Sequence, residues 1–432
     1  MSQAVPVYDL VGVGFGPSNL ALAIALTERN AISPEKTTGV FLERQPHFGW
    51  HRGMLIEDAT MQVSFLKDLV TLRNPTSEFS FLCYLHTRGR LIDFINHKNL
   101  FPLRVEFHDY LEWAAAKVDD LVCYGHEVVG VEPVEGGFLD VTARGRDGVS
   151  VYRARNLVFA TGLRPHLPAG VVPSPHVWHN RDLLVRAGAL ADAKRFVVVG
   201  AGQSAAEVVA FLHDRFPAAE VCAVFSRYGY SPADDSSFAN RIFDPAAVDA
   251  FFDAPPEVKR SLVDYHANTN YSVVDIDLID ELYRRVYREK VLGAQRLRLF
   301  NVSRVADTSE MASGVRTTVE SMATGEQTVL DADAVIYATG YRPADPGPLL
   351  ASCACHRDEA GRLRVGRDYR LVTDPVPGAG IYLQGGTEHT HGITSSLLSN
   401  TAIRAAEILA SIVDRGVPVA GARSAAPQFT TA

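Results

Sequence analysis

The sequence predicts an α/β fold with two separate Rossmann-like domains, because the order strand, glycine-rich turn and helix occurs twice. In the first copy the apolar run VYDLV leads into GVGFGPSNLALA, at residues 12–23. In the second copy FVVV leads into GAGQSAAEVVAFLHDR, from residue 200. A further apolar strand follows each helix, at residues 40–42 and in VCAVF. One such turn is a weak signal, whereas two in this context indicate two dinucleotide-binding domains.

Two similar segments suggest where these domains end. NLVFATGLRP (156–165) and DAVIYATGYRP (333–343) each join an apolar strand to ATG and Arg-Pro. Residues 121–160 are expected to form a small antiparallel meander, and 244–293 have helical periodicity. The expected organisation is a discontinuous first domain (1–170 plus 330–415), a second domain (171–239), a small, mostly helical substrate-binding region that returns to the second domain (240–329), and a disordered tail (416–432).

The composition and charge of the chain indicate which classes of protein it can belong to. The chain has 432 residues, of which 47% are hydrophobic, so large cores can form. Its formal net charge of -8 argues against nucleic acid as a partner. The sequence contains no apolar run near the ~20 residues that span a bilayer, and its start lacks a basic signal region. Five scattered cysteines without a C-x-x-C pair indicate reduced thiols and a cytoplasmic location.

The first turn departs from the usual G-x-G-x-x-G spelling. Its glycines are Gly12, Gly14 and Gly16, and Pro17 follows directly. Pro17 is expected to begin the helix, where a missing N–H costs least. Glu43 ends the next strand, 31 residues after Gly12. A carboxylate there accepts hydrogen bonds from ribose hydroxyls and repels a 2′-phosphate, which favours FAD or NAD.

The second turn fits G-x-G-x-x-A, with Gly200 and Gly202 and with Ala205 in the third place. Its second strand ends in Ser226-Arg227 instead of a carboxylate. A hydroxyl and a guanidinium suit the 2′-phosphate of NADPH. The residues therefore predict one FAD site and one NADPH site, and hence electron transfer from NADPH to flavin. Because the sequence has no C-x-x-C dithiol pair, reaction of the reduced flavin with oxygen is the leading outcome.

Several longer motifs carry a resemblance to a known family. They are GVGFGPSNL, GWHRGM, TMQVSFLKDLVTLRNP (60–75), FANRIFDP, HANTNYSVV and GGTEHTHGITSSLLSN. Together they resemble the flavin-dependent N-hydroxylating amino-acid monooxygenases over about residues 7–410, and MQVSFLKDL…RNP looks more like the ornithine branch. That family spells its first turn G-x-G-x-G-P, as here. Tyr337 departs from the Leu or Phe that usually precedes ATG.

This resemblance implies an activity and a set of site residues. The activity is NADPH- and O2-dependent hydroxylation of L-ornithine to N5-hydroxyornithine through a C4a-hydroperoxyflavin, for siderophore or related hydroxamate biosynthesis. The catalytic residues are Asn270, Arg104 and Gln62. The substrate contacts are Lys67 for the α-carboxylate, with Gln62, Asn240, Phe243, Asn270 and Ser396. The cofactor contacts, besides the glycines, Pro17 and Glu43, are Arg44, Trp50, His51, Met61, Gln62, Val128, Gln203, Ser204, Arg227, Thr269, Asn270, Ser272, Thr394 and Ser395.

Alternatives remain open at the level of sequence. Lys67 precedes Asp68, a pattern more typical of a surface ion pair. Ser395 and Ser396 are not distinguished. His389 and His391 lack a third ligand at metal spacing, so no metal is expected. The substrate could be L-lysine or a diamine, since one methylene is worth only ~1–3 kcal/mol in a pocket. A monooxygenase acting on carbon or sulfur and a non-catalytic FAD/NADP redox sensor are the rivals; a homo-oligomer, dimer or tetramer, is expected.

Overall fold

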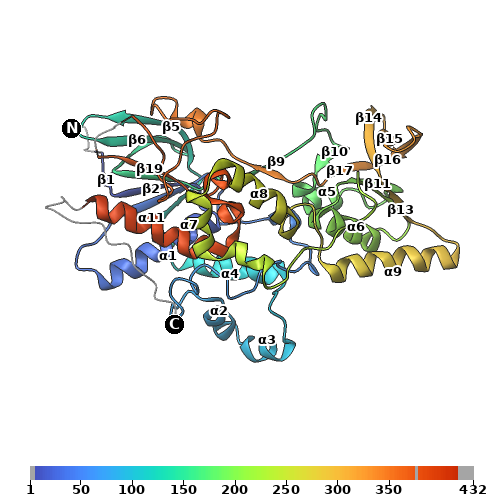
Figure 1. Cartoon of the computed structure of the whole chain (residues 1–432), viewed down its shortest axis with the longest axis horizontal. Coiled ribbons are helices and arrows are strands. Elements are labelled where there is room, and N and C mark those ends of the chain that lie inside the picture. Colours follow the sequence, from blue (N-terminus) through green and yellow to red (C-terminus); the bar gives the residue numbers. More distant parts are fainter. Residues whose placement is uncertain (1–4, 375–377, 417–432) are drawn as a thin grey trace.

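The computed structural model describes residues 5–374 and 378–416 and confirms the α/β fold. Two five-stranded sheets, parallel throughout, lie toward opposite ends of the long axis, and α7 (Pro245–Asp253) and α8 (Pro256–His266) lie between them (Figure 1). The predicted tail lies outside the described residues, apart from Gly416, which ends α11 (Thr401–Gly416). Among the described residues, no helix combines the length and the hydropathy needed to cross a bilayer.

The first sheet carries the first glycine turn. Its strand order is β19 (Gly380–Leu383), β8 (Asn156–Phe159), β2 (Leu10–Val13), β3 (Gly39–Glu43) and β4 (Val122–Tyr124). Alternate side chains enter two cores: Leu10 and Phe41 pack with α1 (Pro17–Ile32) and α11, whereas Val11 and Val40 face a smaller sheet. That sheet has the order β1 (Val7–Tyr8), β7 (Gly148–Ala154), β6 (Phe138–Gly145), β5 (Glu127–Val134).

The second sheet carries the second glycine turn. Its order is β10 (Val177–His179), β17 (Ala334–Tyr337), β11 (Arg195–Val199), β12 (Glu220–Val224) and β13 (Leu297–Phe300). Phe196 and Val198 pack on the side of α6 (Gln203–Arg215) and α9 (Ile276–Leu292). Val197 lies on the other face, which is covered by the antiparallel sheet of β14 (Ser303–Met311), β15 (Gly314–Ser321) and β16 (Gln327–Ala332).

The remaining helices fill the space around these sheets. They are α2 (Phe81–Thr87), α3 (Leu91–His97), α4 (Arg104–Ala116), α5 (Leu183–Ala187) and α10 (Glu388–His391). Short 3-10 turns are η1 (Arg52–Met54), η2 (Asp119–Leu121), η3 (Asn180–Asp182), η4 (Ala239–Phe243), η5 (Ala267–Thr269), η6 (Gly347–Leu350), η7 (Ile393–Ser396) and η8 (Leu398–Asn400). The helical reading of 244–293 is confirmed by α7, α8 and α9.

Two predicted boundaries need correction. The first domain was expected to resume at residue 330, but β17 belongs to the second sheet, paired in parallel with β11. The crossing comes later, at β18 (Tyr341–Pro343), which pairs with β9 (Leu163–Pro165) in a two-stranded antiparallel link. The two Arg-Pro segments are therefore the paired connections between the domains. The meander is also shorter than expected: it covers β5 to β7, and β4 and β8 join the parallel sheet.

Candidate active site

The first turn leaves the start of α1 open to a ligand. Gly14 has φ +83°, and a Cβ there would collide with the Ala160 carbonyl. Gly16 is the N-cap, forms no side-chain cap, and would direct a Cβ into open space. Pro17 is the first helical residue, as the sequence predicts. The helix start therefore offers unpaired amides and a positive dipole end to a pyrophosphate.

Glu43 lies at the carboxyl end of β3, next to this turn. Its side chain is buried and accepts hydrogen bonds from the Phe15 amide (2.6 Å) and the Gln45 amide (2.8 Å). A carboxylate has about four acceptor positions, so capacity remains for ribose hydroxyls. The chain entering β5 approaches the same place, since the His126 amide donates to the Glu43 carbonyl (2.8 Å). Val128 packs against the core between the first sheet and the smaller sheet, and Arg44 is exposed.

The second turn has the same construction as the first, and it lies next to the segment around Ser272, which the resemblance assigns to NADPH contacts. Gly200 has φ +144° and packs against the Ala338 carbonyl, and Gly202 caps α6 without a side-chain bond. A Cβ on Gly202 would lie 3.5 Å from the Ser272 Cα. The Arg227 guanidinium, exposed at the end of the sheet, donates to the Ser272 carbonyl (3.0 Å). Arg227, Ser272 and the turn thus lie close together.

A buried ion pair joins the two domains between these turns. The Arg104 guanidinium, at the start of α4, binds both oxygens of Glu207 on α6, at 2.9 and 2.6 Å. It also donates to the carbonyls of Met54 (3.1 Å) and Thr60 (3.3 Å). The side chains are only 12% and 4% exposed. The resemblance implies that Arg104 is a catalytic residue. In the structure, the contacts of Arg104 with other residues connect the two domains.

Glu207 is a buried carboxylate between the two domains that no sequence motif singled out. It lies four residues after Gln203 on α6, so both side chains share a helix face. Gln203 donates to Glu207 (3.0 Å) and accepts from the Asp275 amide (2.8 Å), the N-cap of α9. An acidic residue inside the apolar run SAAEVVAF was the available signal. Ser204, the next predicted contact, is partly buried on the same first turn of α6.

The ammonium of Lys67 is not paired with a carboxylate in the part of the chain that the structure describes. The neighbouring Asp68 is buried and accepts from the amides of Val70 (2.9 Å), Thr71 (2.6 Å) and Phe81 (2.8 Å). Among residues 5–374 and 378–416, Lys67 takes part in no ion pair. Its ammonium lies 5.6 Å from the centre of the Phe243 ring. The surface ion-pair reading of Lys67 is therefore wrong, and the charge is left for another partner.

The other predicted substrate residues lie on loops that meet near Phe243. η4, which carries Asn240 and Phe243, packs against η7, which ends at Ser396. The chain before η4 hydrogen-bonds to the segment around Asn270: the Ala233 amide donates to the Val274 carbonyl and the Asp234 amide to Asn268. Asn240 itself donates to the Asp235 carbonyl (2.6 Å), and Thr269 donates to His266 (2.7 Å).

The segment 50–62 lines the space between the two domains. The rings of Trp50 and His51 are 4.6 Å apart, and His51 has φ +52°, a strained value for a non-glycine residue. His51 is exposed to solvent, although protein atoms surround its ring closely. Desolvation by those atoms, with the charges of Arg104 and His108, lowers the pKa of His51 to about 4. Met61 is buried and Gln62 is exposed beside it.

In the C-terminal loop, the two predicted serines differ in their burial. Ser395 is buried; its hydroxyl accepts from the Thr387 amide (3.0 Å) and its carbonyl from Arg404 (2.9 Å). Thr394 is also buried, whereas Ser396 is partly exposed. Nearby, buried polar atoms of Thr387, Ser399 and Asn400 have no hydrogen-bond partner among the residues that the structure describes. Such orphan groups fit a polar ligand at this edge of the sheet.

His389 and His391 lie on α10, and their rings hydrogen-bond to backbone carbonyls. The His389 ring bonds the Leu363 carbonyl (2.9 Å) and the His391 ring bonds the Arg367 carbonyl (3.1 Å). The His391 ring also stacks on Tyr369, with centroids 4.1 Å apart. Within residues 5–374 and 378–416, no group of three or more His, Cys, Asp or Glu side chains could hold a metal ion.

Two glycine turns, each at the carboxyl end of a parallel sheet, define a two-domain oxidoreductase of the FAD/NADPH type. Comparisons with known proteins identify the family. The family described as L-lysine 6-monooxygenase/L-ornithine 5-monooxygenase matches residues 6–343, and the chain belongs to this family. The L-ornithine N(5)-monooxygenase of Burkholderia cepacia is 41% identical over 90% of this chain and 91% of its own.

Solved structures agree with this assignment. The ornithine N-hydroxylase of Kutzneria sp. 744, determined with reduced FAD, NADP+ and L-ornithine, is 49% identical with a TM-score of 0.91, over 95% of this chain and 100% of that one. The L-lysine 6-monooxygenase of Pseudomonas syringae is 32% identical with a TM-score of 0.82, over 94% of this chain and 99% of that one.

Proposed function

We propose that this protein is an NADPH- and O2-dependent flavin monooxygenase that converts L-ornithine to N5-hydroxyornithine. The family supports the reaction class, and the higher identity to the ornithine enzymes than to the lysine enzyme supports the substrate. One observation carries the substrate class: among residues 5–374 and 378–416 the Lys67 cation forms no ion pair, and it lies 5.6 Å from the centre of the Phe243 ring. This arrangement suits an α-amino acid, whose carboxylate then completes an ion pair.

FAD and NADPH fit the two turns. We assign the pyrophosphate of FAD to the amides at the start of α1 and its ribose to Glu43. We assign NADPH to the start of α6, with its 2′-phosphate at Arg227 and its other contacts at Ser204, Thr269 and Ser272. When bound, FAD supplies the redox chemistry: it accepts the hydride of NADPH and activates O2. The balanced reaction consumes ornithine, O2, NADPH and a proton, and yields hydroxyornithine, NADP+ and water.

The protein's own part is to position a neutral amine and to exclude water. A free alkylamine has a pKa near ~10.4, so it must lose its proton before it can accept oxygen. A dry pocket that meets the amine with neutral hydrogen-bonding side chains lowers the pKa of the amine and so favours its neutral form. Asn240 and Asn270 are our candidates for those contacts, and Ser396, the exposed member of its serine pair, is the candidate for the carboxylate end. Gln62 and Asn270 border both substrate and cofactors in this proposal.

The wider role stays a proposal. The product is a hydroxylamine ready for acylation to a hydroxamate, which supports siderophore or related natural-product biosynthesis. A cytoplasmic location and a dimeric or tetrameric assembly also remain predictions.

The test is a product assay on the FAD-loaded full chain with NADPH and O2. Ornithine, lysine, putrescine and a sulfide are supplied separately, and products are identified by mass and by a hydroxylamine assay. Ornithine should gain one oxygen atom and give a positive hydroxylamine test. A product from lysine or putrescine in place of ornithine would keep the chemistry but refute the substrate. NADPH oxidation without any hydroxylated product would refute the monooxygenase and favour a redox sensor.

A further inference from the structure

We propose that Glu207 is a positioning residue for the hydroxylation, because it holds two segments of the site at a fixed separation. They are the flavin segment (residues 59–62) and the substrate segment (residues 267–274). This inference rests on the proposed function, which places Gln62 and Asn270 of these segments beside substrate and cofactors. A chain of hydrogen bonds, the bridging chain, joins the two segments, and its members in order are Thr60, Arg104, Glu207, Gln203 and Asp275.

The first end of the bridging chain is firmly attached to the flavin segment. The Arg104 amide donates to the Ala59 carbonyl (2.7 Å), and its guanidinium donates to the Thr60 carbonyl (3.3 Å). Beside them, the Met61 amide donates to the Pro102 carbonyl (2.8 Å). Because both the backbone and the side chain of Arg104 bond this segment, a displacement of the guanidinium is transmitted to it.

Glu207 sets the direction of every bond in the middle of the bridging chain. Its oxygens accept from Arg104 at 2.9 and 2.6 Å, and one of them also accepts from the Gln203 side chain at 3.0 Å. An ionised carboxylate only accepts hydrogen bonds, so the NH2 group of Gln203 must face it. The Gln203 side-chain oxygen then points away from Glu207 and accepts from the Asp275 backbone amide (2.8 Å). The carboxylate thus fixes the orientation of the Gln203 side chain.

The last bond of the bridging chain acts where the substrate segment ends. Asp275 follows that segment directly and is the N-cap of α9. Three residues earlier, Ser272 has φ +55°, an uncommon value for a residue other than glycine, which needs support from its surroundings. The other bonds of the segment, to residues 231–234 and to Arg227, do not involve the first domain, whereas the bridging chain ends in it.

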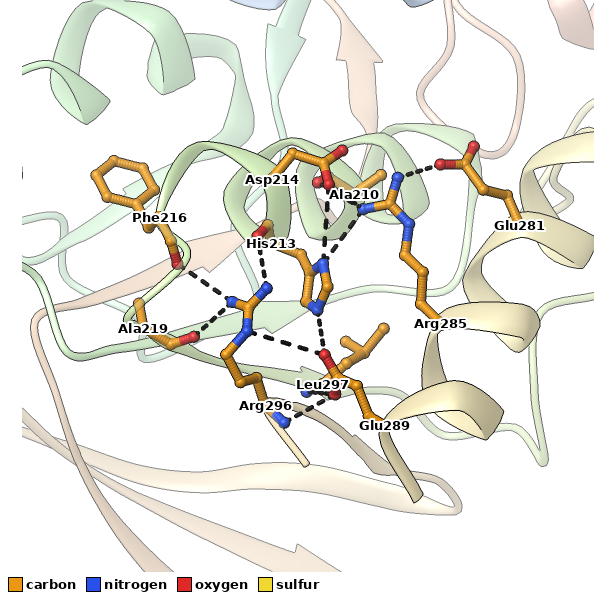
Figure 2. Close-up of polar contacts among 10 residues, drawn as sticks. All are labelled: Ala210, His213, Asp214, Phe216, Ala219, Glu281, Arg285, Glu289, Arg296 and Leu297. Atoms are coloured by element: carbon orange, nitrogen blue, oxygen red, sulfur yellow. Dashed lines mark hydrogen bonds and ion pairs between the residues drawn. The ribbon is translucent and has the colours of Figure 1, made fainter. Parts of the chain in front are cut away.

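A separate buried cluster holds the far end of α6 and α9, as Figure 2 shows. The His213 ring on α6 bonds Glu289 on α9 (2.6 Å). The other Glu289 oxygen accepts from the amides of Arg296 and Leu297, both at 2.8 Å. His213 is ten residues after Gln203, which is about 15 Å along the helix at ~1.5 Å per residue. The two ends of α9 are therefore fixed by different contacts, and each can be changed without the other.

Two substitutions at Asp275 isolate the last bond. Its φ of −55° is a value that proline adopts, and Val274 before it is extended, in a bridge to Pro232. Asp275→Pro therefore removes the N–H without distorting the backbone. Asp275→Ala keeps the N–H and, like proline, lacks the carboxylate that caps α9. The difference between the two variants reports the bond to Gln203.

Steady-state kinetics of the FAD-loaded full chain measure its effect on the reaction. The KM for ornithine in Asp275→Pro should be roughly three- to tenfold above that in Asp275→Ala, which corresponds to one neutral hydrogen bond. A smaller share of the NADPH consumed should yield hydroxyornithine. Without ornithine, the two variants should oxidise NADPH at similar rates, because the second glycine turn and Arg227 are unchanged.

Hydrogen exchange followed by mass spectrometry reports on the substrate segment without substrate or NADPH. Amides 268–274 should exchange faster in Asp275→Pro than in Asp275→Ala. Gln203→Met removes the same bond from its other side and should give the same result, also if the proline variant does not fold. His213→Leu is the matched control, since it removes a buried bond between the same helices: it should speed exchange over 286–297 and leave 268–274 and the KM unchanged.

Three results would overturn the positioning role. They are equal exchange of 268–274 in the proline and alanine variants, faster exchange with an unchanged KM and unchanged yield of hydroxyornithine, and a His213→Leu variant that raises the KM as much as Asp275→Pro. A wild type that forms no hydroxyornithine would refute the proposed function instead. Because the exchange comparison needs no substrate, it would still decide whether the bridging chain holds the segment.

Discussion

The ion pair between Arg104 and Glu207 should contribute strongly to stability because it is buried and connects the two domains. In Glu207→Ala the guanidinium loses both carboxylate bonds, at 2.9 and 2.6 Å, but keeps the carbonyls of Met54 and Thr60. Removing one partner of a buried pair costs about 3–5 kcal/mol. The retained carbonyl bonds place this variant near ~3 kcal/mol, and Glu207→Gln, which keeps one acceptor and the side-chain shape, near half of that.

Urea unfolding of the FAD-loaded protein, followed by circular dichroism and by flavin fluorescence, measures this effect. A cycle with Arg104→Met, Glu207→Met and the double variant isolates the pair: the double variant should be more stable than the sum of single losses predicts, by about 2 kcal/mol. Anaerobic reduction of the flavin by NADPH should also be slower in Glu207→Ala, because α6 carries both Glu207 and the second turn. Single losses under ~0.5 kcal/mol that simply add would refute the bridging role.

Four further outcomes follow from the site. Lys67→Met should raise the KM for ornithine roughly 10- to 100-fold, the value of one charge-assisted bond, while NADPH oxidation continues without coupling to hydroxylation; an unchanged KM would remove Lys67 from carboxylate binding. Arg227→Ala should reduce the preference for NADPH over NADH about tenfold in steady-state kinetics, and equal use of both by the wild type would refute the assignment. Gly14→Ala should lower the melting temperature of the FAD-free protein, whereas Gly16→Ala should leave it unchanged and weaken FAD binding in a titration; the reverse pattern would contradict the turn geometry. Burial lowers the pKa of His391 to about 4 from its ordinary 6.5, so below pH 6.5 the unfolded state binds more protons than the folded state. The free energy of unfolding should therefore fall as the pH is lowered, by about 2 kcal/mol at pH 5. In urea titrations His391→Phe should flatten this pH dependence, and an equally steep dependence would exclude His391 as its source.

The sequence predicted the local pattern of the fold well. The two strand, turn and helix units, the end of β3 at Glu43 and the start of α1 at Pro17 all depend on neighbouring residues, and all are present. The boundary at residue 330 failed for a tertiary reason. Residues 334–337 fall after this boundary, yet an apolar strand followed by ATG fits the middle of either parallel sheet. Only the pairing with β11 decides which sheet it joins.

The candidate site was likewise predictable where it depends on local motifs and not where it depends on long-range contacts. Single motifs pointed to Lys67, Arg227 and the glycines, whose chemistry is visible in the residue type. The pairing of Glu207 could not be predicted, because its partner Arg104 is 103 residues away and no local pattern links α4 to α6. The availability of Lys67 was equally invisible, since it depends on Asp68 turning toward the amides of Val70 and Phe81. Long-range polar pairing is a property of the folded chain and leaves little trace in a single sequence.

The central claim is that this chain hydroxylates the side-chain amine of L-ornithine with electrons from NADPH. The most direct measurement supplies the FAD-loaded protein with L-ornithine, NADPH and isotopically labelled O2, and follows the product by mass. The account predicts one labelled oxygen atom in ornithine, on nitrogen, formed in proportion to the NADPH consumed. Oxidation of NADPH that yields only peroxide with ornithine present, or label appearing on carbon, would contradict it.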